Sequence, residues 1–85
     1  MTPAALQKLH LIYNFVSEQL KLGTRPAIVI DTLIRAHGAT VAFTGGANTI
    51  RVGGVSGSCT SDADKGLLAS WHGCAKRRLG REGRL

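Results

Sequence analysis

The chain has 85 residues, of which 44% are hydrophobic and 19% charged, and its formal net charge at pH 7 is +6. A chain of this length forms one domain that buries only about 60% of the surface exposed by its unfolded form, so we expect a partner to add stability. No apolar run approaches the roughly 20 residues that cross a bilayer, and no signal peptide is evident. The chain is therefore predicted to be cytoplasmic, with no membrane partner and with reduced thiols.

The positive charge is unevenly placed along the chain. Residues 1–75 carry six Lys and Arg against four Asp and Glu, whereas residues 76–85 carry five against one. A basic end of this kind can bind phosphate, an acidic peptide or a membrane surface, or it can serve only to keep the chain in solution.

A first helix is predicted from Thr2–Pro3 to about Leu22, with a stop at Gly23. Thr caps free amide groups, Pro fits the first helical position, and Gly is the usual residue just after a helix. Apolar residues at alternating spacings of three and four form one stripe, which is the expected buried face: Leu6, Leu9, Tyr13, Val16 and Leu20.

The same helix carries a second apolar stripe, formed by Leu11, Phe15 and Leu22. A domain this small cannot easily cover both stripes, and a second copy is the commonest partner for such a surface. We therefore predict a homodimer with Leu11, Phe15 and Leu22 at its interface. The alternative is that Leu11 and Phe15 pack against later segments of the same chain.

A second helix is predicted to follow Thr24-Arg25-Pro26, because a capping residue and a proline again precede an apolar segment. Helical spacing continues to His37, and Gly38 is the expected stop. Residues 27–30 are also compatible with a buried strand. The helix is preferred because its pattern extends over more than two turns.

A two-stranded hairpin is predicted next, with strands near residues 39–44 and 48–55 joined through Gly45-Gly46. Alternation places one set of side chains inward, namely Val41, Phe43, Ile50 and Val52. It places the other set outward, namely Thr40, Ala42, Thr44, Thr49 and Arg51. Both edges of a two-stranded hairpin are unpaired, so each can accept an added strand from a partner.

Residues 53–58 are interpreted as a flexible connector of glycine and serine. A third helix is predicted to be capped within Thr60–Asp64, to stop at Gly80, and to bury one face: Leu67, Leu68, Trp71, Ala75 and Leu79. The predicted fold class is therefore α+β, a helix-helix-hairpin-helix (ααββα) domain over residues 1–80. Residues 81–85 are predicted to be a disordered basic tail.

Few residues suggest chemistry. Cys59, His72 and Cys74 lack the paired short spacing of a structural zinc site, and a Cys59–Cys74 disulfide stays open as an alternative. A nucleophilic set of Cys59, His37 or His72, and Asp62 can be drawn, but nothing in the spacing requires these residues to meet. We predict no catalytic residue, no metal and no cofactor.

Residues 27–79 resemble the TubC-type N-terminal docking domain of peptide synthetase and polyketide assembly lines. The features that carry the resemblance are hydrophobic spacing and glycines: Gly38, a strand with Val41 and Phe43, a glycine turn, the strand Ile50-Arg51-Val52, and a helix with Leu67-Leu68, Trp71 and Lys76-Arg77. The resemblance implies a helix-helix-hairpin-helix module that is typically homodimeric. It also implies an exposed hairpin that receives a short C-terminal peptide of the preceding enzyme, with Thr40, Thr49 and Arg51 facing that partner.

A small free-standing chain of this form is also similar to accessory proteins of phages and other mobile elements, which often bind one host protein. We therefore predict a non-catalytic protein-interaction module, a homodimer that binds and could inhibit a host protein. Its predicted partner-binding residues lie on the hairpin and at the basic end: Thr40, Thr49, Arg51, Lys76, Arg77, Arg78 and Arg81. The alternative is a small basic nucleic-acid-binding or regulatory protein, whose basic end would contact phosphates.

Overall fold

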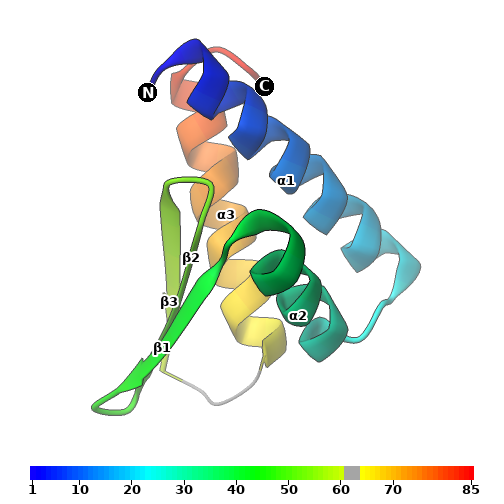
Figure 1. Ribbon diagram of the computed structural model, residues 1–85, viewed down its shortest axis with the longest axis vertical. Coiled ribbons are helices and arrows are strands. Elements are labelled where there is room, and N and C mark those ends of the chain that lie inside the picture. The colour runs from blue at the N-terminus through cyan, green and yellow to red at the C-terminus, as the bar shows by residue number, and fades with distance from the viewer. Residues whose placement is uncertain (61–63) are drawn as a thin grey trace.

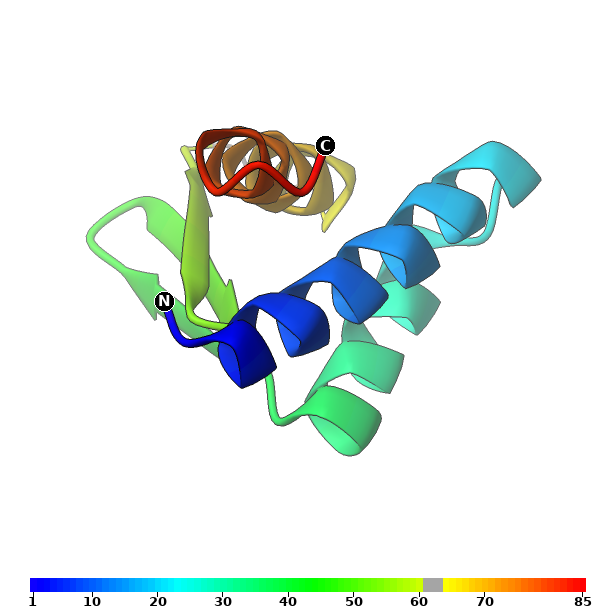
Figure 2. The same cartoon turned by 90° about the horizontal axis from the view of Figure 1, so that it is seen from above.

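The computed structural model describes residues 1–60 and 64–85, apart from the side chain of Thr44, and places three helices on one side of a three-stranded sheet (Figures 1 and 2). The elements follow in the order α1 (Pro3–Leu22), α2 (Pro26–His37), β1 (Thr40–Thr44), β2 (Ala47–Val52), β3 (Val55–Cys59) and α3 (Asp64–Arg81). The sheet is an antiparallel meander in the order β1-β2-β3. No helix among the described residues is long and apolar enough to cross a membrane.

The predicted bounds of the first helix are confirmed, whereas the predicted cap of the second is wrong. Thr2 Oγ1 accepts a hydrogen bond of 3.2 Å from the Ala5 amide, and Gly23 ends α1 in the left-handed conformation. In α2 the capping position is Arg25, which makes no side-chain capping bond. Thr24 lies one residue too early, and its hydroxyl instead donates to Gln19 Oε1 at 2.7 Å.

The sheet has three strands, so the predicted two-stranded hairpin followed by a flexible connector is wrong. Residues 55–59 form β3, which pairs with β2 in the register Val52 with Val55 and Ile50 with Gly57. Val55 is the one large apolar side chain of this strand, so its sequence shows little of the apolar–polar alternation that predicts a strand. Its second buried position is Gly57, where α3 approaches so closely that a Cβ atom would clash with the backbone nitrogen of Trp71.

Trp71 joins α3 to the sheet and is fully buried, as predicted from its apolar stripe. Its indole Nε1 donates to the carbonyl oxygens of Val52 and Val55, each at 3.2 Å, and so holds the turn between β2 and β3. The core around it draws on every helix and on strands β2 and β3: Leu6, Leu9, Ile12, Val16, Val29, Ile30, Leu33, Ala39, Ile50, Val52, Val55, Leu67, Leu68, Trp71, Ala75 and Leu79.

The two ends of α3 differ from the prediction in detail. The predicted cap falls partly on Ser61, Asp62 and Ala63, which lie outside the described residues. At the other end α3 continues to Arg81 instead of stopping at Gly80. The amides of residues 82–84 then donate to carbonyl oxygens of the last helical turn, at 2.8–3.2 Å.

Phe43 is the clearest error in the predicted core. It shares the helix-facing side of the sheet with Val41 and Ile50, as the alternation predicted, but 69% of its surface is exposed. The turn between β1 and β2 projects away from the helices, at the lower left of Figure 1, so no helix of residues 1–60 or 64–85 lies under this end of the strand. Period-two alternation fixes the side of a sheet but not how far the covering helices extend.

Candidate functional site

The outer face of the sheet carries the three hairpin residues predicted to bind a partner. Thr40 pairs with Arg51, and Thr49 lies between Ala42 and Ser58 in the register. The described side chains on this face are short, apart from one arginine: Thr40, Ala42, Ala47, Thr49, Arg51, Ser56 and Ser58. The face therefore offers hydroxyl groups and one cation, without a large apolar anchor.

The edge of the sheet along β1 is open. The turn Gly45-Gly46 has two residues with positive φ, as in a type I′ hairpin, in which the residues flanking the turn form a hydrogen-bonded pair. Alternation from that pair directs the amide and carbonyl groups of Val41 and Phe43 away from β2. Among the described residues, β1 makes its extensive contacts with β2 alone.

The opposite edge, along β3, is covered by α3. The Ser58 amide points outward from the sheet and donates to Ser70 Oγ at 3.1 Å. The buried Gly57 lies directly under Trp71 of the same helix. The two edges of one small sheet therefore differ in their ability to accept another strand.

The composition of β1 also suits an added strand. Natural edge strands are commonly protected by charged residues, proline or a bulge, and the segment TVAFT of β1 contains no charge and no proline. Phe43, exposed over 69% of its surface, stands beside the open edge on the helix-facing side. An incoming strand would find backbone partners at Val41 and Phe43 and an aromatic ring to cover.

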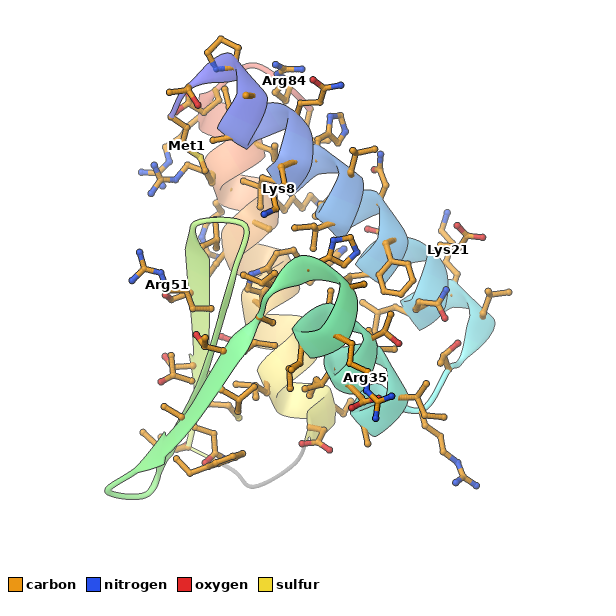
Figure 3. All side chains as sticks on the ribbon, in the orientation of Figure 1. Met1, Lys8, Lys21, Arg35, Arg51 and Arg84 are labelled. Atoms are coloured by element: carbon orange, nitrogen blue, oxygen red, sulfur yellow. The ribbon has the colours of Figure 1, made fainter. Side chains whose placement is uncertain are left out.

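A pocket of about 430 Å³ lies at the Thr40 end of β1. Lys8 from α1, His37 from the end of α2 and Arg51 from β2 contribute its charged and titratable side chains. Lys8 and Arg51 lie on opposite sides of this pocket, as Figure 3 shows. The end of the open edge is therefore positively charged.

A second hollow, of about 350 Å³, lies between the turn that joins β2 to β3 and the C-terminal half of α3. We call it the arginine pocket, and its lining residues are Arg51, Gly54, Val55, Ser56, Cys74, Arg77, Arg78 and Arg81. It joins Arg51 of the predicted hairpin surface to three residues of the predicted basic end. Lys76, predicted with them, is exposed and does not line this pocket.

The predicted dimer stripe of α1 is divided in the structure. Leu11 and Leu22 are exposed over 62% and 69% of their surfaces. Phe15 is half-buried, packs against the core, and has its ring centre 6.0 Å from that of His37 on α2. Phe15 thus follows the alternative of packing within the chain, while an interface through Leu11 and Leu22 stays a prediction.

A serine and a histidine meet between α1 and α3, a contact that was not predicted from the sequence. Ser17 Oγ and His72 Nε2 are hydrogen-bonded at 2.7 Å, and the Tyr13 ring stacks on His72 with its centre 4.6 Å away. Burial, and to a lesser extent the charge of Lys76, lowers the pKa of His72 below its ordinary value. The available signal was the i, i+4 spacing of Tyr13 and Ser17 and the position of His72 next to Trp71.

The Ser17–His72 pair lacks the third member of a nucleophilic site. Within residues 1–60 and 64–85, no carboxylate hydrogen-bonds to His72, and an orienting group is what fixes the base of such a site. The pair instead links α1 to α3 through a polar contact beside a pocket of about 470 Å³. Its geometry supports a structural role.

The cysteines form neither a disulfide nor a metal centre with the residues that the structure describes. Cys59 and Cys74 are not joined to each other. Cys74 Sγ instead accepts a hydrogen bond of 3.3 Å from Arg77 Nη2, at the wall of the arginine pocket. No group of three or more metal-binding side chains occurs in residues 1–60 and 64–85, and Asp62 of the drawn nucleophilic set lies outside them.

Comparisons of the chain with protein-family models, with curated proteins and with solved structures find no match. The resemblance to the TubC-type docking domains therefore stays a prediction.

Proposed function

We propose that the chain is a non-catalytic protein-interaction module that binds an extended segment of a host protein along β1. The single observation that carries the proposal is the open edge, at which Val41 and Phe43 present backbone groups while α3 covers the opposite edge. Addition of a strand to an exposed sheet edge is a recurring mode of peptide recognition. It needs no catalytic or metal-binding residue.

Two contributions to the binding free energy are expected when a strand is added at β1, backbone hydrogen bonds and the covering of Phe43. Amide and carbonyl groups of Val41 and Phe43 would make up to four hydrogen bonds, each contributing about 0.5–1.5 kcal/mol net. Covering Phe43, now 69% exposed, would add about 1.5–3 kcal/mol for a large apolar side chain. An apolar partner residue beside Phe43 is therefore the first specificity element.

Charge gives the second specificity element. The pocket at the Thr40 end of β1 contains Lys8 and Arg51, and the whole chain carries a net charge of +6. Acidic residues in the partner segment, near the Thr40 end, would complement these cations and raise the association rate. The expected ligand is an extended segment with an apolar residue beside Phe43 and carboxylates beside Lys8 and Arg51.

The decisive variant is Val41→Pro. The Val41 amide points to the open edge, so proline there removes a donor for an incoming strand without removing a bond between β1 and β2. We expect the variant to fold, as judged by circular dichroism, and to lose a partner that the tagged wild-type protein captures from nuclease-treated bacterial lysate. Thr49→Ala, at an outer-face residue that the sequence predicted to bind the partner, is the comparison variant and should keep the partner if the contact runs along the edge.

Hydrogen exchange on the captured complex locates the contact. Protection that rises at the Val41 and Phe43 amides would support the proposal. A partner that Val41→Pro retains at wild-type level, or protection confined to amides outside β1, would overturn it. Light scattering identifies the case in which the added strand comes from a second copy of this chain, and a dimer that Val41→Pro dissociates would replace the host protein with a homodimer.

A further inference from the structure

We infer that the arginine pocket is a second binding site, which shares Arg51 with the pocket at the Thr40 end of β1, and that it takes the phosphate backbone of a nucleic acid. Arg51 from β2 and Arg77, Arg78 and Arg81 from α3 line the same hollow of about 350 Å³, beside the backbone of the turn that joins β2 to β3. Residues 26 or more positions apart in the sequence thus contribute to one cationic surface.

The four arginines have no carboxylate partner among residues 1–60 and 64–85. The two ion pairs of the described chain lie elsewhere, between Arg35 and Asp31 and between Glu82 and the Met1 amine. In the pocket, Arg77 donates instead to the Cys74 sulfur. Like charges gathered without a counter-charge repel one another, so an anion that occupies the pocket relieves that repulsion.

The type of cation indicates the chemistry of the ligand. A guanidinium group is planar and presents paired N–H donors that match phosphate oxygens, and arginine is the residue of choice for recognising phosphate. Ser56, opposite Arg51 in the register, adds a hydroxyl group to the same pocket. Arg, Ser and Thr side chains are the ordinary contacts of a nucleic-acid backbone.

The cations also extend beyond this one pocket. Arg51 and Gly54 line the neighbouring pocket as well, which adds Lys8 and His37 on the other side of Arg51. A ligand with regularly repeated negative charge can use both hollows at once, whereas a single phosphate can use only one. Duplex DNA carries one charge per about 1.7 Å of helix axis and meets this requirement.

The adjoining outer face favours a nucleic acid over an acidic protein. Protein interfaces depend on buried anchors such as Trp, Tyr or large apolar side chains. The outer face offers short side chains and one arginine: Thr40, Ala42, Ala47, Thr49, Arg51, Ser56 and Ser58. Short hydroxyl side chains can contact phosphate and sugar, and contacts to phosphate and sugar carry no sequence information directly, so the binding should depend little on sequence.

The test is binding of a fluorescently labelled duplex oligonucleotide of arbitrary sequence, followed by anisotropy over a range of salt concentrations. Four phosphate contacts predict a slope of about −3 to −4 in log affinity against log salt, or a loss of about 100-fold between 50 and 200 mM. The double variant Arg77→Gln/Arg81→Gln should reduce this slope by about 2 and weaken binding at least tenfold at low salt.

A charge-matched control separates the pocket from net charge. Lys21→Gln/Arg25→Gln removes two exposed cations near the end of α1 and the start of α2, and Figure 3 shows Lys21 on the far side of the molecule from Arg51. We expect this control to keep the wild-type slope. Equal losses in the two double variants would overturn the inference, because they would show attraction by net charge alone.

Two further measurements distinguish a nucleic acid from an acidic protein, and the arginine pocket from the open edge. Poly-glutamate that binds the wild-type protein as tightly as the duplex does, and equally needs Arg77 and Arg81, would assign the pocket to an acidic protein and overturn the inference. Val41→Pro should bind the duplex like the wild-type protein, since Val41 lines neither of the two pockets. The failure of either proposal can therefore be recognised without the other.

Discussion

The two turns of the sheet have the same sequence, Gly-Gly, but opposite surroundings. At Gly45 and Gly46 no atom lies within 4 Å of the position a Cβ would occupy. At Gly53 such a Cβ would lie 3.2 Å from Leu9 Cδ1 and 3.3 Å from Ile12 Cδ1. The indole of Trp71 further fixes this second turn through Val52 and Val55.

This contrast divides the molecule into a packed part and an open part. The β2–β3 hairpin is held against α1 and α3, and the Ser58 amide at its outer edge donates a hydrogen bond to Ser70 Oγ. The β1–β2 turn projects into solvent, with Phe43 exposed beside it. Stability is expected to depend on the first part, and binding along β1 on the second, because regions with few buried contacts are the ones free to accept a partner.

The largest expected effect comes from adding one methyl group to the packed part. Gly57→Ala places a Cβ against the backbone nitrogen of Trp71 and 2.5 Å from the Trp71 Cα. Backbone atoms cannot move aside as a side chain can, so α3 must shift away from β3. We expect the free energy of unfolding to fall by about 3 kcal/mol, measured by urea denaturation followed through Trp71 fluorescence.

Gly80→Ala is the matched control for this prediction. It adds the same methyl group within α3, where no atom lies within 4 Å of the new Cβ. Alanine favours the helix over glycine, so this variant should gain up to about 1 kcal/mol. A Gly57→Ala variant as stable as the wild-type protein would contradict the close approach of α3 to β3.

The same contrast explains which parts of the fold could be predicted from the sequence. Caps, prolines and glycine stops predicted α1 closely, because those signals are local. The third strand could not be recognised from the sequence. Its buried position must be a glycine, Gly57, because α3 contacts it there through Trp71, a residue 14 positions further along the chain. In the sequence this contact is visible only as a glycine, and a glycine in a serine-rich segment is equally typical of a connector.

Like the fold, the candidate sites could be predicted from the sequence only where their signals are local. The basic run at Arg77, Arg78 and Arg81 was evident from composition, but its meeting with Arg51 depends on how α3 lies against β3. The open edge of β1 was expected, although two open edges were predicted in place of one. The Ser17–His72 contact depends on the relative placement of α1 and α3, which no local pattern specifies.

A smaller effect is expected from alanine at the two turns. Gly45→Ala and Gly53→Ala both place alanine at positive φ, of 54° and 63° respectively, which costs about 1–2 kcal/mol in each case. Gly53→Ala must also displace Leu9 and Ile12, so its cost should exceed that of Gly45→Ala by about 1 kcal/mol. Urea denaturation of the two variants measures the difference.

Asparagine provides the control at both positions, because it tolerates the left-handed conformation better than alanine. Gly45→Asn should recover most of the stability lost in Gly45→Ala, since the surroundings of that turn are open. Gly53→Asn should recover little, because the larger side chain still meets α1. If Gly45→Ala were the more damaging of the two alanine variants, the division into a packed and an open turn would be wrong.

The smallest effect is expected from protonating His72, on the α1-facing side of the packed part. Its pKa is lowered in the folded protein, so between the folded value and the ordinary value of 6.5 the unfolded chain binds more protons. The free energy of unfolding must then decrease as the pH falls through about 6.5. We expect the melting temperature to be lower at about pH 5.5 than at about pH 7.5.

His72→Gln tests the origin of that decrease. Glutamine can still bond to the Ser17 hydroxyl but does not titrate, so the variant should lose less melting temperature between the two pH values than the wild-type protein does. His10 and His37 remain in both proteins and cancel in the comparison. An equal decrease in both proteins would assign the acid sensitivity to another group. A smaller decrease in His72→Gln would show that protonation of His72 weakens the contact between α1 and α3 in acid.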